Sequence, residues 1–181
     1  MVPSLLGQNC SMHETDDDLA ELQDLLDTSA AAGGLHLKRI ITKERRLTAE
    51  ALCDQLRGMC LLTLATVNSK GRPIGGPVDG IFFRGHFYFG SASDSFKFVH
   101  IGRNPAVSAT HLPGEYLSVT VHGTAVPFDV HAPEHGAFKQ ALLDIYVPRY
   151  GKEWETFLAS GVRYARIDAQ RMFTFFMPDE Q

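Results

Sequence analysis

The stretch from Cys60 to Phe89, CLLTLATVNSKGRPIGGPVDGIFFRGHFYF, decides the fold of this chain. Residues 60–67 are apolar and rich in β-formers, and the NSKG sequence at residues 68–71 is a strong turn signal. A second strand pattern follows over residues 77–83, and Arg84-Gly85 turns the chain into a third, aromatic strand. Because short turns connect successive strands, we expect a meander with antiparallel pairing.

The rest of the chain adds strands and helices in an order that argues against a doubly wound sheet. The strand patterns fall in hairpins, and no regular alternation of strand and helix occurs. This order predicts a mainly β, α+β fold in which six antiparallel strands form a small barrel with peripheral helices. We expect helices over residues 93–103, 133–146 and 152–158, and strands over residues 106–112, 116–126 and 162–176.

Residues 1–45 are expected to form an N-terminal extension to a main domain that covers residues 46–181. Leucines recur at helical spacing behind three aspartates, which predicts a short helix over residues 16–26. The small residues 30–34 then suit a linker, so the extension is either a flexible arm or a segment that packs on a partner subunit. Thr48 is a good N-cap for a second helix, which leads into the first strand.

The composition argues against several classes of function. The formal net charge is -4 and the pI is near 6.0, so nothing predicts attraction to nucleic acid or to acidic lipid. The three cysteines, Cys10, Cys53 and Cys60, form no CxxC pair, so we expect free thiols rather than disulfides or a metal site. The sequence shows neither a signal-peptide pattern nor an apolar run that could span a bilayer. We therefore expect a cytoplasmic protein with no membrane or nucleic-acid partner.

Three serines at alternating positions, Ser91, Ser93 and Ser95, follow the third strand, and Lys97 lies in the first turn of the helix that they open. A helix N-terminus offers unpaired N–H groups, and with hydroxyls and an ammonium it makes a pocket suited to phosphate. Arg72 stands at the start of the neighbouring strand and could add a guanidinium. Taken singly, Ser91 and Ser95 are more simply explained as capping residues, but Lys97 in this setting is not.

Residues 116–126 show the clearest strand pattern, and one face of this strand predicts an interface. The apolar side chains of Leu117, Val119 and Val121 alternate with polar or aromatic ones. A face exposed only to solvent would usually carry Lys, Glu or Arg. The opposite face is formed here by Tyr116, Ser118, Thr120 and His122. Such a mixture suits a subunit interface or a ligand groove, although β-propensity alone could also explain it.

Five short motifs occur in a fixed order within residues 48–130, and they are Ala65-Thr66-Val67, Gly71-Arg72-Pro73, Pro77-Val78, Ser95-Phe96-Lys97 and Asn104-Pro105-Ala106-Val107-Ser108. In order and spacing these motifs resemble the FMN-binding split barrel of the pyridoxamine-5'-phosphate-oxidase-like proteins. Residues 1–45 have no counterpart in this pattern. The position three after Lys97, which is often Asn in those proteins, is His100, a departure that bears on how this helix is tied to its neighbours.

The resemblance implies a six-stranded split barrel that forms a homodimer and holds its cofactor in a groove between the subunits. It implies that FMN, or alternatively a deazaflavin coenzyme, exchanges a hydride with a small organic substrate. No catalytic side chain is identified. By position, Ser93 and Lys97 hold the phosphate, with Ser91 beside them, Arg72 and Pro73 border the cofactor tail, and Pro77, Val78 and Asp79 run along the ring system.

Two other functions occur among proteins of this kind, one enzymatic and one non-catalytic. The oxidase that acts on pyridoxamine phosphate carries a basic C-terminal segment, whereas this chain ends in the acidic Asp179-Glu180-Gln181. We therefore do not expect that activity. Some split-barrel proteins handle haem, so a non-catalytic flavin or haem binder, with His111 or His122 as an axial ligand, is the alternative from another class.

Overall fold

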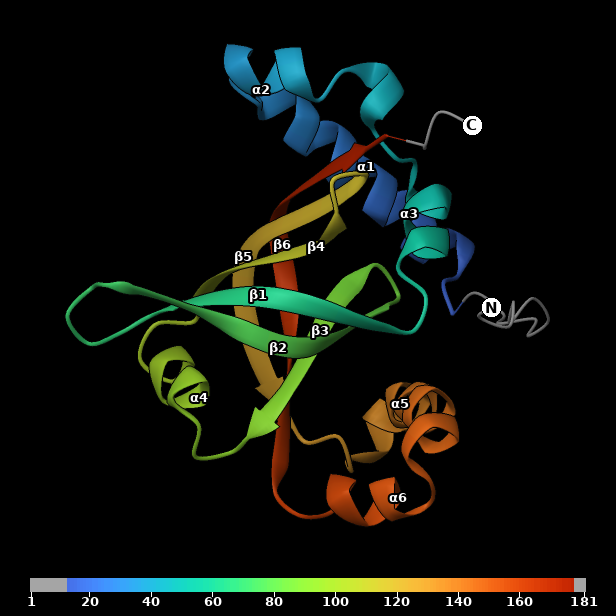
Figure 1. The fold of residues 1–181 in the computed structure, drawn as a ribbon, viewed down its shortest axis with the longest axis vertical. Helices are drawn as coiled ribbons and strands as arrows, with labels where there is room; N and C mark the ends of the chain where they lie inside the picture. Colours follow the sequence, from blue (N-terminus) through green and yellow to red (C-terminus); the bar gives the residue numbers. More distant parts are fainter. Residues whose placement is uncertain (1–12, 178–181) are drawn as a thin grey trace.

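Six antiparallel strands close into a barrel in a computed structural model of the protein, which describes residues 13–177 (Figure 1). Their order around the barrel is β1-β2-β3-β6-β5-β4, and β1 pairs with β4 to complete the ring. The expected six-stranded antiparallel barrel of a mainly β, α+β fold is confirmed. The strands are β1 (Met59–Val67), β2 (Pro73–Phe83), β3 (His86–Ala92), β4 (Ala106–Gly114), β5 (Leu117–Phe128) and β6 (Val162–Phe176).

The helices gather at the two ends of the barrel (Figure 1). The first three helices lie at the end where β6 finishes, and the last three lie at the opposite end. Among the described residues, no helix has both the length and the apolar character needed to cross a membrane. The helices are α1 (Asp16–Ala32), α2 (Leu35–Ile40), α3 (Ala49–Gln55), α4 (Phe96–Ile101), α5 (Gly136–Tyr150) and α6 (Glu153–Leu158), with short 3-10 turns at Lys43–Arg45 and Pro133–His135.

Several element boundaries differ from the sequence-based expectation. Helix α1 continues to Ala32 because alanines extend it beyond the predicted end at residue 26, and α2 was not expected at all. Strand β2 begins at Pro73 rather than at residue 77, because Gly75 and Gly76 pair with β1 despite their low strand propensity. Helix α4 begins at Phe96, so the serines before it form a turn rather than a helix.

The barrel interior is filled by the inward-facing side chains that the alternation on β5 predicted. Leu117, Val119 and Val121 are buried together with residues of every other strand. Cys53 and Cys60 are free and buried, and burial raises the pKa of each thiol to about 12. A second apolar cluster lies between the barrel and the α5–α6 pair, and it fixes these helices against β3 and β6.

Helix α1 packs on the barrel of its own chain. Its residues Leu22 and Leu26 belong to the main core cluster. The Ser29 hydroxyl accepts a hydrogen bond from the Met172 backbone amide of β6 at 2.9 Å. Helix α1 is therefore not a free arm, while packing of the extension on a partner subunit and the domain boundary at residue 45 stay predictions.

A bulge in β6 makes Gly123 indispensable to the β5–β6 pairing. His122 pairs with Arg171 and Gly123 pairs with Ala169, so Gln170 has no partner and the register shifts. A Cβ atom added at Gly123 would lie 2.2 Å from the backbone oxygen of Asp168. The two strands approach too closely here for any side chain.

We expect Gly123→Ala to lower the free energy of unfolding by about 1–3 kcal/mol, because backbone atoms would have to move to admit the methyl group. Gly75→Ala is the matched control, since a Cβ there meets nothing within 4 Å. Its effect should stay below about 1 kcal/mol. Urea unfolding of both variants measures the difference, and equal midpoints would contradict this account of the bulge.

Candidate functional site

A cavity of about 450 Å³ lies between the barrel and the α5–α6 pair. Its volume falls in the range of small-molecule sites in proteins. Strands β2 and β3 supply one wall, helices α5 and α6 supply another, and α4 contributes a lysine. It is lined by Leu61, Pro77, Val78, Asp79, Ile81, Tyr88, Gly90, Ser91, Ala92, Lys97, Phe138, Tyr146, Trp154, Phe157, Ser160, Gly161, Val162 and Tyr164.

The structure brings five of the eight predicted cofactor residues to this cavity. They come from two neighbouring strands and the helix that follows them, as the order of motifs suggested. These five are Pro77, Val78, Asp79, Ser91 and Lys97. Side chains alternate along β2, so Val78 is buried while Pro77 and Asp79 are exposed on the opposite face.

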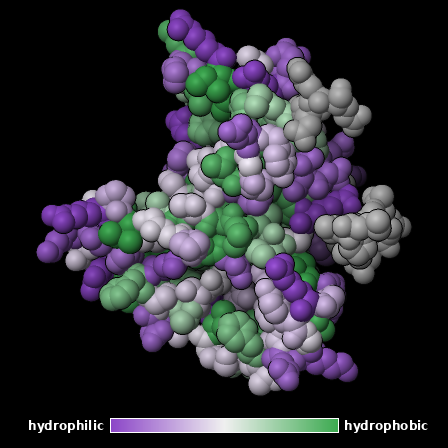
Figure 2. Space-filling view, viewed as in Figure 1, coloured by the Kyte–Doolittle hydropathy of each residue, from purple (hydrophilic) through white to green (hydrophobic). Residues whose placement is uncertain are grey.

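Arg72, Pro73 and Ser93 do not line the cavity. Arg72 and Pro73 lie at the β1–β2 hairpin, and Pro73 is four residues from Pro77, or about 13 Å along an extended strand. The hairpin projects from the barrel in Figure 1, and its tip is hydrophilic in Figure 2. Ser93 is exposed, and its backbone amide donates to the Gly161 carbonyl at 3.3 Å. Their roles stay predictions.

One end of the cavity is suited to an anion. Lys97 is half-buried, and none of the described carboxylates forms an ion pair with its ammonium. Ser91, also half-buried, adds a hydroxyl. Ser95 caps α4 by position, but its hydroxyl oxygen is buried without any hydrogen-bond partner in the described chain. Ser95 does not line the cavity, but the Lys97 ammonium and the Ser91 hydroxyl do, and neither has a partner in the described chain, so together they fit a phosphate group.

The other end is aromatic, and sequence reasoning missed it. The rings of Tyr146 and Trp154 stack at 4.6 Å, and those of Tyr88 and Phe138 stack at 4.2 Å. The Tyr164 ring lies over Gly90, where a Cβ atom would sit 2.8 Å from it. The available signal in the sequence was Tyr146, a tyrosine at the end of the helix predicted over residues 133–146.

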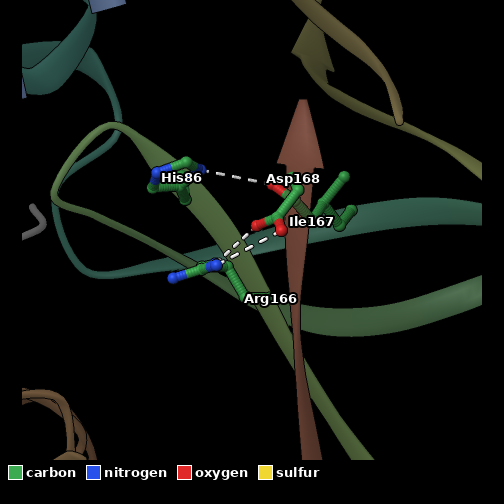
Figure 3. Close-up of polar contacts among 4 residues, drawn as sticks. All are labelled: His86, Arg166, Ile167 and Asp168. Carbon is green, nitrogen blue, oxygen red and sulfur yellow. Dashed lines mark hydrogen bonds and ion pairs between the residues drawn. The ribbon is translucent and has the colours of Figure 1, made fainter. Parts of the chain in front are cut away.

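Tyr88 differs from Tyr146 and Tyr164, which also line the cavity, because a guanidinium acts on its phenol. The charge of Arg166 of β6 favours the ionised form of Tyr88, and this guanidinium also forms a bidentate ion pair with Asp168 (Figure 3). His86 lies beside this pair and contacts the Ile167 carbonyl at 3.4 Å. Burial raises the pKa of the Tyr88 phenol, although Arg166 opposes the shift.

Helix α4, which carries Lys97, is tied to the barrel by His100. The His100 Nδ1 atom lies 2.9 Å from the Thr66 hydroxyl of β1, and both residues are buried. His100 stands at the position that is often Asn in the proteins that the sequence resembles, and here the histidine itself ties the helix to β1. Because the bond is sealed from water, it fixes the orientation of the helix and hence of its lysine.

None of the histidines in the described chain lines the cavity. The His111 ring contacts the Leu61 carbonyl at 2.9 Å, and the His122 ring contacts the Ser108 hydroxyl at 2.7 Å. Within residues 13–177, no three His, Cys, Asp or Glu side chains are grouped so as to hold a metal ion. A second cavity, of about 320 Å³, lies between the N-terminal helices and β6 and contains none of the predicted site residues.

Solved structures of the same architecture give this arrangement a fold name. A conserved hypothetical protein of Mycobacterium tuberculosis matches with a TM-score of 0.62 at 19% identity, over 77% of this chain and 94% of that one. The haem storage protein HutZ of Vibrio cholerae matches with a TM-score of 0.56 at 16% identity, over 72% and 94%. The chain has the split-barrel fold.

A FAD-binding protein of Mesorhizobium loti is a further split barrel of this type. It matches with a TM-score of 0.51 at 20% identity, over 71% of this chain and 92% of that one. No protein-family model matches the chain, and no curated protein matches it in sequence. At these identities the similarity concerns the split-barrel fold alone, so the activity has to be argued from the cavity.

We expect the His100–Thr66 contact to contribute about 1–3 kcal/mol to the stability of the split barrel, because each partner alone would leave a buried polar group unsatisfied. A double-mutant cycle of His100→Phe and Thr66→Val measures this coupling by urea unfolding. Losses that simply add in the double variant would show that the bond does not hold α4.

Proposed function

We propose that this chain is a flavin-dependent oxidoreductase that binds FMN in the cavity between the barrel and the α5–α6 pair. A deazaflavin coenzyme is the close alternative. The observation that carries the proposal is the polarity of the cavity, which has an unpaired ammonium on the side of α4 and aromatic walls on the side of α5 and α6 (Figure 1). A molecule with a phosphate and a flat ring system matches both ends.

The residues of the cavity have separate tasks in this proposal. Lys97 and Ser91 would hold the phosphate, and Pro77, Val78 and Asp79 would run along the ring. A bound flavin supplies the hydride chemistry itself. The protein would orient the ring, exclude water through its aromatic wall and leave room for a small organic substrate. The acidic segment 179–181 lies outside the described chain, so the expectation that pyridoxamine phosphate is not the substrate stays a prediction.

We also propose that the protein is a homodimer whose interface includes the outward face of β5. Thr63, Thr110, Thr120 and Phe173 form an uncharged row across four neighbouring strands. The hydroxyls of Thr110 and Thr120 form a hydrogen bond with one another at 3.0 Å, so these two polar groups can be buried at an interface without a partner from the other subunit. Leu61, which is 59% exposed, lies on the outer face of β1 and also lines the cavity, so a partner here would cover the cavity's edge.

Haem binding is the competing function, and the similarity to HutZ is the observation that favours it. Haem iron is held by an axial histidine, cysteine thiolate, methionine or tyrosine. None of the residues that line the cavity is a histidine, a cysteine or a methionine, and His111 and His122 are engaged elsewhere. Three tyrosines line the cavity, but burial raises the pKa of each phenol, which disfavours the phenolate that would bind iron. The lining of this cavity therefore favours a flavin over haem.

We expect Lys97→Ala to weaken FMN binding roughly ten- to a hundredfold, because a charge-assisted bond to phosphate is lost. Lys70→Ala is the control, since Lys70 lies exposed in the β1–β2 turn. Fluorescence titration of both variants with FMN, a deazaflavin and haem measures the affinities. Small and equal losses for the two variants would contradict the phosphate site, and binding of haem alone would contradict the flavin proposal.

We expect Thr120→Arg to dissociate the homodimer and to lower cofactor occupancy, because two arginines would meet across the interface without a counter-ion. Gln140→Arg on the exposed side of α5 is the control and should leave the mass unchanged. Light scattering gives the mass, and flavin absorbance gives the occupancy. A wild type that is monomeric at micromolar concentration yet saturated with cofactor would disprove the shared groove.

A further inference from the structure

Two buried tyrosines at the aromatic end of the cavity have hydroxyls without a protein partner. Tyr146 is 5% exposed and Tyr164 is 7% exposed. Neither hydroxyl forms a hydrogen bond with any residue of the range 13–177. A buried tyrosine hydroxyl usually has a partner, since leaving it unsatisfied is unfavourable. No group of the described residues satisfies this pair, so solvent or a ligand has to do so.

Both tyrosines line the cavity, and their oxygens are not sealed from solvent. Among the described side chains, Ser95 Oγ is the one polar atom that is sealed from solvent and also lacks a partner. The tyrosine oxygens thus retain access to solvent space, and both residues line the cavity. A molecule in the cavity can reach them directly.

The packing of the two rings fixes the positions of these hydroxyls. The Tyr146 ring lies parallel to the Trp154 indole, at 4.6 Å and an interplanar angle of 6°. The Tyr164 ring meets Phe138 edge-on at 5.8 Å and lies over Gly90. Because the rings are already immobile, little conformational entropy is lost when a ligand binds the hydroxyls.

Asp79, which is exposed and also lines the cavity, adds a third polar group without a partner in the described chain. None of the described residues forms an ion pair or a hydrogen bond with its carboxylate. Burial, and then the negative charge of Asp79, raise the pKa of Tyr146 and of Tyr164, so both phenols stay neutral and can donate. The end of the cavity thus presents two O–H donors and one carboxylate acceptor.

We propose that Tyr146, Tyr164 and Asp79 bind the imide edge of a planar heterocycle, with the phenols donating to its two carbonyls and the carboxylate accepting from its N–H. This inference rests on the proposed function and deepens it, because flavin and deazaflavin rings both carry such an edge. Haem does not. The phosphate end then selects the cofactor's tail, and the tyrosine end selects the class of ring.

The test compares FMN with riboflavin, which has the same ring and no phosphate. Tyr146→Phe and Tyr164→Phe each remove one donor and keep the ring, so each should weaken FMN and riboflavin alike, roughly two- to tenfold. Lys97→Ala should weaken FMN but not riboflavin. Tyr150→Phe is the matched control on the same helix, since Tyr150 is 52% exposed and does not line the cavity.

Fluorescence titration gives the affinities, and thermal unfolding checks that each variant is folded. Equal losses for FMN and riboflavin in both tyrosine variants, with none in Tyr150→Phe, would support the imide site. Flavin binding that is unchanged in Tyr146→Phe and Tyr164→Phe would overturn it and leave the proposed function standing. A wild type that binds neither flavins nor a deazaflavin would overturn both.

Discussion

The pairing of β6 with two strands at once holds this molecule together. Strands β3 and β5 are separated in the sequence by α4 and β4, and β6 bonds to both of them. Without β6 the other five strands would leave two open edges. The bulge opposite Gly123 lets β6 bend as it passes from one neighbour to the other. The closed ring, the core inside it and the surface on which helix α1 packs all depend on this pairing.

The same pairing creates the cavity. The chain enters β6 directly from α6, so the α5–α6 pair is held beneath the barrel next to β3. Aromatic side chains fill most of the space between helices and strands, and what remains is the site. Its anion-binding and aromatic ends come from different parts of the chain: α4 and β3 supply Lys97 and Ser91, whereas α5 and β6 supply Tyr146 and Tyr164. Barrel closure is what places these parts in one cavity.

Local patterns were sufficient for the strands and for part of the site. The alternation at Leu117, Val119 and Val121 correctly predicted a core-facing side, and the order of β2, β3 and α4 brought Asp79 and Lys97 to the same cavity. Features that depend on distant contacts could not be found this way. The pairing of Gly75 and Gly76 with β1 overrides their propensity. The aromatic wall comes from helices whose orientation depends on packing rather than on sequence period.

The bonds between the N-terminal segment and β6 have a consequence for synthesis. Ser29 bonds to Met172 and Leu47 bonds to Thr174, across 143 and 127 residues of chain. Contacts of such long sequence separation form late, because a large loop must close first. On the ribosome, β6 is synthesised last of the six strands. Until it emerges, helix α1 has no β6 to pack against, and one edge of β3 and one edge of β5 form no hydrogen bonds with a neighbouring strand. During that interval the nascent chain exposes apolar surface and strand edges. We therefore expect chaperones to be needed while the chain folds during synthesis rather than after it has folded.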